Sequence, residues 1–446
     1  MNAAANLVTD ALRRQWGGRD GALARWRGAA LAVVLGSATA LAVAYAPMPR
    51  TLLVGAVGAL VVALVLTASP TLTAVLLGAS IPEIQDLTGG HLGVHVAASD
   101  VIMVLIGAGL LAEGAARQQI PSLVALRRVR FPVVQYVWLI ALLLVVHLSV
   151  GSLLKSGQRL ELFALPLLVG AFIALRGRHM IVLRAYVLAA TLLAIVWPIL
   201  NAHGLAGQFQ KNPTGGFIAS AILLVIAVRE LRRLWWCAPL LLVGAGLTAS
   251  RGAILALVVG VVVIFLMQAG ASRRAIMVAR ILALVVTALV VYQFLPANIA
   301  SRLTNYIPST SSRSSYALYI REAYDHDAEQ LIAAHPWTGV GVGNYLAGAV
   351  TQGTSTTDPH NVILLEAAEG GYVFAASFIL LIGGVAFALW RVRRNELAAG
   401  AAAVLVATAA HGLVDVYWVR GTPVLGWLIV GMVCGLVSKG SSEVSA

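Results

Sequence analysis

Residues 133–154 read VVQYVWLIALLLVVHLSVGSLL and contain no Asp, Glu, Lys or Arg. An uncharged apolar run of about 20 residues is long enough to cross the roughly 30 Å hydrocarbon core of a bilayer as one α-helix. Comparable runs recur along the whole chain, in which 60% of residues are hydrophobic and only 11% are charged. This composition is typical of an integral membrane protein.

The apolar runs predict an all-α fold, a polytopic transmembrane helical bundle. Several runs are short for a full crossing, so neighbouring pairs can be half-helices, and we expect about 12 to 14 spans. An even number of spans places both termini on the same side of the membrane. The predicted spans are residues 29–46, 51–68, 71–81, 96–112, 133–154, 160–175, 180–200, 217–228, 234–247, 253–267, 281–295, 372–390, 397–411 and 422–437.

The spacing of these runs divides the chain into three parts. Residues 1–295 are predicted to form an N-terminal transmembrane bundle, and residues 372–446 the C-terminal transmembrane helices. Between them, residues 296–371 form a long polar loop. Because long loops in compact proteins are usually functional, we expect the chemistry in this loop.

The basic residues predict the orientation in the membrane. Lys and Arg collect in short cytoplasmic loops, and with both termini cytoplasmic most of the 31 Lys and Arg fall on that face. The long loop then lies on the extracytoplasmic side. The net charge of +13 is explained by this orientation and by anionic membrane lipids, so nucleic acid is not expected as a partner. The basic residues predicted on the outer face are Arg50, Lys155, Arg159, Lys211, Arg251, Arg302, Arg313, Arg321 and Arg420.

The first half of the loop contains a predicted amphipathic helix, residues 313–334. Arg313 and Arg321 project from it, and each can reach a pocket under the loop or remain solvated. Asp325 and Asp327 form an acid-x-acid pattern, but residues two apart on a helix point about 200° apart, so no metal site is expected. The apolar positions at helical spacing are Tyr316, Ile320, Tyr324, Ala328 and Leu331.

The second half of the loop opens with a glycine-rich motif. Residues 335–345 read HPWTGVGVGNY and begin with His335. Alternating glycines permit backbone conformations that other residues avoid, and they allow close approach of a ligand or of another chain segment. These glycines are Gly339, Gly341 and Gly343.

A second motif stands where the chain re-enters the membrane. Residues 358–361 read DPHN, and the segment that follows carries Glu366 and Glu369. A histidine at a membrane rim is more often a hydrogen-bonding cap than a catalyst. Taken alone, His360 fits both interpretations.

Two further motifs bring a basic residue to the start of a helix. Residues 210–216 read QKNPTGG, which fits an ordinary loop-to-helix junction, although a helix N-terminus beside Lys211 can also hold an anion. Residues 250–252 read SRG. Arg251 is either an anchor whose side chain reaches the membrane surface or a bidentate phosphate ligand.

In their order and spacing, these motifs resemble the O-antigen ligase and O-antigen polymerase superfamily of bacterial membrane glycosyltransferases. The resemblance covers roughly the C-terminal half of the chain, and Thr214 departs from the small residue, often Asn, that usually follows NP in the family. It rests on NP at 212–213, SRG at 250–252, an arginine-bearing helix running into HPWTGVGVGNY, HN at 360–361 followed by EGG, and HGLVDVYW at 411–418.

The resemblance implies a GT-C-like bundle in the bacterial cytoplasmic membrane with its active site on the extracytoplasmic side. Enzymes of this kind transfer a glycan from a polyprenyl phosphate or pyrophosphate carrier to an acceptor hydroxyl. We expect an envelope glycan or glycolipid as acceptor, inversion at the anomeric carbon, and no metal or other cofactor. Ligase, polymerase and protein O-glycosylating enzyme stay open as alternatives.

The chemistry of this transfer suggests roles for the candidate residues. Fixed arginines can stabilise a leaving phosphate, and a histidine can accept the proton of the acceptor hydroxyl or, as imidazolium, bind phosphate. We expect His360, Arg251 and Arg321 to be catalytic. The residues expected to bind substrate are Lys211, Asn212, Arg313, His335, Gly339, Gly341, Gly343, Asn361 and Glu366.

The alternative from another class is a lipid-linked oligosaccharide flippase or transporter. Transporters usually carry functional charges near the bilayer midplane and have internally repeated halves. No matching pair of charges is seen in two halves of this chain, and a large one-sided loop suits an enzyme better.

Overall fold

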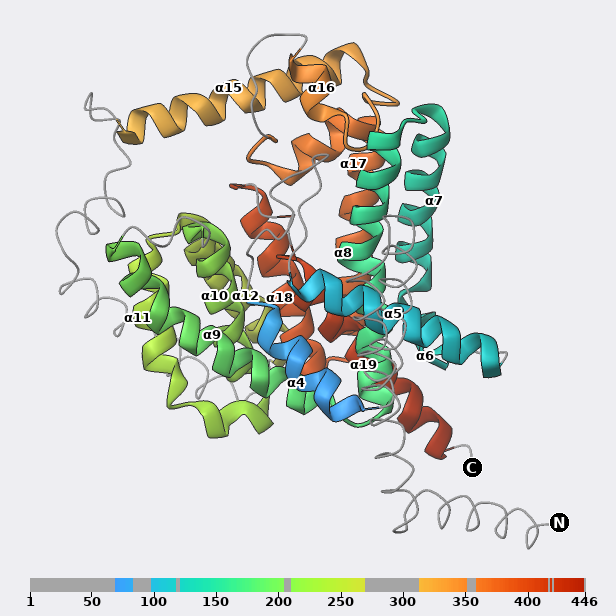
Figure 1. Ribbon diagram of the computed structural model, residues 1–446, viewed down its shortest axis with the longest axis vertical. Helices are drawn as coiled ribbons and strands as arrows, with labels where there is room; N and C mark the ends of the chain where they lie inside the picture. The colour runs from blue at the N-terminus through green and yellow to red at the C-terminus, as the bar shows by residue number, and fades with distance from the viewer. Residues whose placement is uncertain are drawn as a thin grey trace, which may run out of the picture. The chain divides into compact units, whose positions relative to one another are not determined.

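The computed structural model describes residues 69–82, 98–117, 121–203, 210–268, 313–350, 358–415, 418 and 421–444 (Figure 1). Within these ranges all regular secondary structure is helical, which confirms the prediction of an all-α, polytopic membrane bundle. Three predicted spans, 29–46, 51–68 and 281–295, lie outside the described residues. The helices long and apolar enough to cross a membrane are Leu123–Val146, Val150–Leu175, His179–Ala202, Arg251–Gln268 and Val362–Trp390.

The chain divides into two compact units, Met1–Thr73 with Leu105–Gln119, and Ala74–Val104 with Ile120–Ala446. Two helices, α4 (Pro70–Ser80) and α5 (Ala98–Arg117), extend across the division. The second unit contains the other described helices and all the predicted site residues. Its helices are α6 (Pro121–Ala125), η2 (Leu126–Val129), α7 (Arg130–Val146), α8 (Val150–Leu175), α9 (His179–Ala202), α10 (Lys211–Ala227), η4 (Arg229–Leu234), α11 (Cys237–Thr248), α12 (Arg251–Gln268), α15 (Arg313–Ala334), α16 (Tyr345–Val350), α17 (Val362–Trp390), α18 (Glu396–Gly412) and α19 (Val424–Val444).

One loop lies at a different place in the structure than the sequence predicts. The run 133–154 was expected to be one span, with a loop at 155–159, but α7 ends at Val146 and α8 begins at Val150. Ser149 caps α8, because its hydroxyl accepts a 3.0 Å hydrogen bond from the Ser152 backbone N–H. Lys155 and Arg159 are therefore helical residues rather than loop residues.

Close backbone contacts join α8 to α19. A Cβ on Gly170 would collide with the backbone of Leu428, and a Cβ on Gly431 would collide with the carbonyl of Leu167. Gly435 lies in the same way against Ala171, where a Cβ would stand 2.7 Å from the carbonyl oxygen. Small residues at helix crossings are typical of membrane bundles, in which packing rather than the hydrophobic effect drives association.

Helix α17 is interrupted at Gly371, which has φ 73° and ψ −179°. Few residues other than glycine adopt this conformation. The interruption separates a short segment, 362–370, from the span 372–390 that the sequence predicts. A Cβ on Gly371 would also lie 2.5 Å from the carbonyl oxygen of Trp337, so the glycine is required both by its conformation and by its neighbour.

The loop 335–344 compensates for the break in α17. The last carbonyls of a helix have no partner within the helix, and here the Val340 and Gly341 N–H groups donate to the Ala368 and Glu369 carbonyls at 3.0 and 2.8 Å. In return, the Tyr372 N–H donates to the Pro336 carbonyl at 2.8 Å. The glycine-rich loop and the broken helix thus form one hydrogen-bonded unit.

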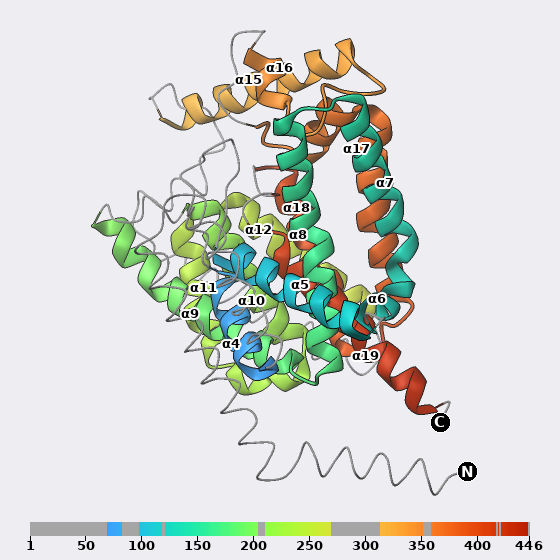
Figure 2. The ribbon, with the colours of Figure 1, turned by 45° about the vertical axis from the view of Figure 1, so that its right-hand side comes forward.

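Helices α15 and α16 lie beside the first part of α17 (Figures 1 and 2), and buried side chains of all three form a small hydrophobic core. Tyr324, Ala328 and Leu331 are buried, which confirms the amphipathic pattern over this part of α15. The side chains of Tyr316 and Ile320 lie outside the described residues. The members of this core include Ile332, Tyr345, Ala349, Leu365, Ala367 and Ala368.

We expect Gly371→Ala to lower the stability of the protein by about 1–3 kcal/mol, because alanine is strained in this backbone conformation. The matched control is Gly383→Ala in the same helix, where an added Cβ meets nothing within 4 Å. The control should be neutral, or stabilising by about 1 kcal/mol, since alanine favours the helix. Thermal unfolding of the purified variants measures both changes, and equal midpoints would contradict the role of the break.

Candidate functional site

Asp415 brings together two candidate side chains that are distant in the sequence, Arg321 and His360, and it also lies near His411. Its Oδ1 lies 3.9 Å from the Arg321 guanidinium and 3.9 Å from His360 Nε2. Its Oδ2 lies 3.9 Å from Nε2 of His411, one helical turn earlier. At this distance none of the three contacts is a direct hydrogen bond, and the Arg321–Asp415 contact is an ion pair. We call Arg321, His360, His411 and Asp415 the His360 cluster.

His360 is held on one face by an aromatic ring. The ring of Tyr324 stacks on the imidazole with centroids 6.0 Å apart and an interplanar angle of 12°. The imidazole is only 19% exposed, and its Nδ1 has no hydrogen-bond partner within the described part of the chain. A buried polar nitrogen without a partner is unusual in a folded protein and calls for an explanation.

The surroundings of His360 keep the imidazole neutral. Burial, followed by the positive charge of Arg321, lowers the pKa of His360 from 6.5 to about 4. A histidine with a lowered pKa is uncharged at all pH values well above the new pKa. At neutral pH the ring can therefore accept a proton.

The SRG motif forms the turn between α11 and α12. Ser250 caps α12, because its hydroxyl accepts a 3.3 Å hydrogen bond from the Ala253 N–H. Ala249 has φ 49° and ψ 32°, a left-handed conformation that is unusual for a residue with a Cβ. Arg251 begins α12 with an exposed side chain. A Cβ on Gly252 would collide with the His411 ring, so this glycine brings Arg251 next to the His360 cluster.

Lys211 and Asn212 begin α10, and their helix start lies against the same turn. A Cβ on Gly215 would stand 2.8 Å from Ala253 Cβ and 2.9 Å from Thr248 Oγ1. The N-terminal ends of α10 and α12 are thus neighbours. Each carries a basic residue and the partial positive charge of a helix N-terminus.

The glycines of the HPWTGVGVGNY loop have a role in folding. Gly339, Gly341 and Gly343 have φ of 58°, 94° and 77°. A Cβ on Gly341 would lie 2.6 Å from His147 Cβ, and one on Gly343 would collide with the Lys155 side chain. A Cβ on Gly339 would collide with the Glu369 carbonyl group. Their predicted contact with substrate is not needed to explain them and stays a prediction, as it does for the exposed His335.

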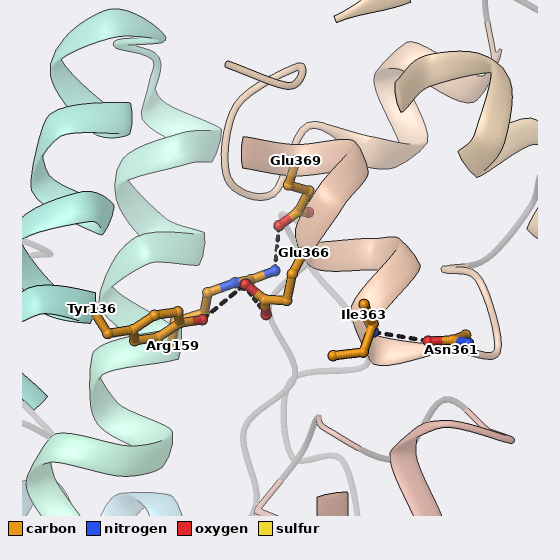
Figure 3. Close-up of polar contacts among 6 residues, drawn as sticks. All are labelled: Tyr136, Arg159, Asn361, Ile363, Glu366 and Glu369. Carbon is orange, nitrogen blue, oxygen red and sulfur yellow. Dashed lines mark hydrogen bonds and ion pairs between the residues drawn. The ribbon is translucent and has the colours of Figure 1, made fainter. Parts of the chain in front are cut away.

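Asn361 is the N-cap of α17. Its side-chain oxygen accepts hydrogen bonds from the Ile363 and Leu364 N–H groups at 2.9 and 3.3 Å. This cap fixes the helix start directly after His360. Figure 3 shows Asn361 and Ile363 at one end of the short helix and Glu369 toward the other. A substrate contact by Asn361 stays a prediction.

Glu366 faces α7 and α8 (Figure 3), and its expected contact with substrate stays a prediction. The Arg159 guanidinium donates to Glu366 and to Glu369 through different nitrogens. Tyr136 donates a 2.9 Å hydrogen bond to Glu366 and lies 3.3 Å from the guanidinium. Glu366 is only 1% exposed. We call Arg159, Tyr136, Glu366 and Glu369 the arginine clamp.

The remaining acidic candidates of α15 point in different directions. The Asp325 carboxyl accepts a hydrogen bond from the His360 backbone, and burial raises its pKa. Asp327 is buried, whereas His326 is exposed and contacts Gln330 at 2.9 Å. Arg313 is the first residue of α15, and its side chain lies outside the described residues.

Several residues of these clusters were missed in the sequence. Asp415 and His411 form an i,i+4 pair in HGLVD, a spacing that places two side chains on one helical face. Glu366 and Glu369 are three apart, which signals a shared partner on a neighbouring helix. The partner, Arg159, could not be chosen from the sequence, because it lies 207 residues from Glu366.

We expect Arg321→Met to raise the pKa of His360 toward 6.5, since the variant removes the positive charge beside the imidazole while leaving the burial. NMR titration of histidine-labelled protein in nanodiscs measures the change, and the His360→Gln spectrum assigns the signal. Arg184→Met is the matched control, because Arg184 is exposed on α9. An unchanged titration of His360 in Arg321→Met would contradict the electrostatic coupling.

Comparison with known proteins gives one match to a protein family. The family model described as O-antigen ligase matches residues 236–379, which include Arg251, Arg321 and His360. No curated protein matches the chain. The chain is thus an integral membrane protein in which residues 236–379 match the O-antigen ligase family, in agreement with the motifs in its sequence.

Proposed function

We propose that the protein is a membrane glycosyltransferase that moves a glycan from a polyprenyl phosphate or pyrophosphate carrier to a hydroxyl of an envelope glycan or glycolipid. The reaction is inverting and needs no metal. The observation that supports this proposal is that Arg321 and His360 both contact Asp415, while the turn that carries Arg251 packs against His411 through Gly252. The matched family segment spans all three candidates.

The arginines stabilise the leaving group. As the bond between C1 of the sugar and the phosphate oxygen breaks, negative charge grows on the phosphate. Arg251 and Arg321 offer planar guanidinium groups that bind phosphate through two hydrogen bonds each. Lys211, at the start of the neighbouring helix, extends the positive surface, and Arg313 remains a further candidate from the sequence. Preorganised positive charge of this kind lowers the barrier without a metal ion.

His360 acts as the general base. Its imidazole is neutral at neutral pH, which favours proton acceptance over phosphate binding as an imidazolium. The acceptor oxygen attacks C1 as its proton passes to the imidazole, and the carrier phosphate leaves on the opposite side. Because a bound carrier adds negative charge beside Arg321, it raises the pKa of His360 and strengthens the base when the substrate is present.

The membrane orientation completes the proposal. The basic residues favour cytoplasmic termini, with loop 296–371 and the His360 cluster on the extracytoplasmic side. The carrier enters laterally from the bilayer, with α15 as part of the cover over the site.

We expect Arg251→Ala and His360→Ala each to reduce transfer by at least about tenfold, or about 1.4 kcal/mol of barrier, while leaving the protein folded. The measurement is transfer of a labelled glycan from a polyprenyl pyrophosphate carrier by purified protein in nanodiscs with excess chelator. Arg251→Lys should also fail, since an ammonium group cannot form the two-pronged contact. Arg184→Ala serves as the control and should transfer normally.

Three outcomes would count against the proposal. Normal transfer by both Arg251→Ala and His360→Ala would remove the assigned site. Transfer that the chelator abolishes would contradict a metal-independent reaction. Movement of the carrier across the bilayer without any transfer would favour a flippase.

A further inference from the structure

The break at Gly371 gives the short helix 362–370 a pivot at its C-terminal end. His360 and its capping neighbour Asn361 stand at the start of this helix, and the chain breaks at Gly371 beyond its end. Residues in a helix rise by about 1.5 Å each, so His360 lies about 16 Å along the chain axis from the pivot. A tilt of about 5° at Gly371 would move His360 by more than about 1 Å.

The arginine clamp opposes this tilt. Glu366 and Glu369 leave the short helix on the side of α8, and the two nitrogens of one guanidinium bind them separately. Two contacts three residues apart restrain the rotation of the helix as well as its distance from α8. The same guanidinium lies 5.5 Å from the ring of Phe374, beyond the break, so one side chain touches both parts of α17.

Tyr136 of α7 also holds the arginine clamp in place. Its hydroxyl binds both Glu366 and Arg159, and its ring stacks on Phe374 with centroids 5.0 Å apart and an interplanar angle of 4°. Helices α7 and α8 thus both hold the short helix (Figure 3).

We propose that Arg159 is a positioning residue for His360, acting through the short helix 362–370. The inference rests on the proposed function of His360. It assigns to the arginine clamp the task of setting the angle of this helix, so that the imidazole stays beside Asp415 and Tyr324. Arg159 itself does not touch the reacting atoms.

A contribution to folding alone does not account for the arrangement of the clamp. Buried ion pairs cost desolvation and are often replaced by apolar residues without loss of stability. An apolar contact does not fix the relative orientation of its partners, whereas a planar guanidinium bound by two carboxylates holds them in one geometry.

Matched variants distinguish a role of Arg159 in positioning His360 from a role in folding. Arg159→Met alone leaves two buried carboxylates without their counter-charge, and such variants are often strongly destabilised. The triple variant Arg159→Met/Glu366→Gln/Glu369→Gln removes the charges together and should unfold at nearly the wild-type temperature. Arg159→Lys is the second variant, since it keeps the charge but cannot bind both carboxylates in a planar fork.

We expect both the triple variant and Arg159→Lys to transfer glycan at least about tenfold more slowly, because a shift of about 1 Å at a catalytic group can cost about a hundredfold. Each variant is then combined with His360→Ala, in endpoint assays long enough to measure residual transfer. If Arg159 acts through His360, its loss adds little once His360 is gone. Arg184→Met should leave transfer unchanged in either background.

Wild-type transfer by the folded triple variant, or by Arg159→Lys if the triple variant fails to fold, would overturn the inference. So would an equal fold loss with and without His360, which is the result for a residue needed only for folding. Both outcomes keep the proposed function, provided that His360→Ala itself is impaired. Normal transfer by His360→Ala would instead overturn the proposed function and the inference with it.

Discussion

A buried guanidinium must be paired, and Arg159 meets this requirement with two carboxylates from a helix far away in the sequence. The pairing explains why α8 continues through residues that read as a loop, why Glu366 turns away from the candidate site, and why α17 can break without losing its direction. The break exposes two carbonyls, and the glycine-rich loop satisfies them. The helix break, the glycine-rich loop and the arginine clamp therefore act together to hold a short helix at the rim of a membrane bundle.

The His360 cluster gathers motifs from four parts of the chain around a single carboxylate. Asp415 contacts Arg321 and His360 from the loop region, while His411 joins it to the turn that carries Arg251. Gly252 makes this connection possible, since any side chain there would displace the His411 ring. The residues proposed for phosphate stabilisation and for proton acceptance are thus neighbours of the same two side chains, His411 and Asp415.

The helices were readily predicted because apolar runs and membrane thickness determine them, and the pattern at Tyr324, Ala328 and Leu331 predicted the buried face of α15. The resemblance of short motifs selected Arg251, Arg321 and His360, and the structure brings their neighbourhoods together. What the sequence could not supply is pairing between distant segments. Lys155 and Arg159 were predicted to lie in a loop, because burying a charged side chain in a membrane is unfavourable. Only the positions of Glu366 and Glu369 in the structure explain why a charged residue lies within the helix here. Likewise, the close packing of Gly339 against the Glu369 backbone could not be predicted from the sequence.

The close contact between α8 and α19 has a consequence for the environment in which the protein works. Membrane helices tilt and shift as the bilayer becomes thinner or thicker. Helix α7 has a largely exposed apolar surface, including Phe131, Trp138 and Val145, and it must follow such changes. Helix α8 is restrained by backbone contacts with α19 at Gly170, Gly431 and Gly435, which prevent the two helices from sliding past each other. Because Arg159 projects from α8, the arginine clamp ties the short helix 362–370 to the more tightly packed of the two helices that hold it.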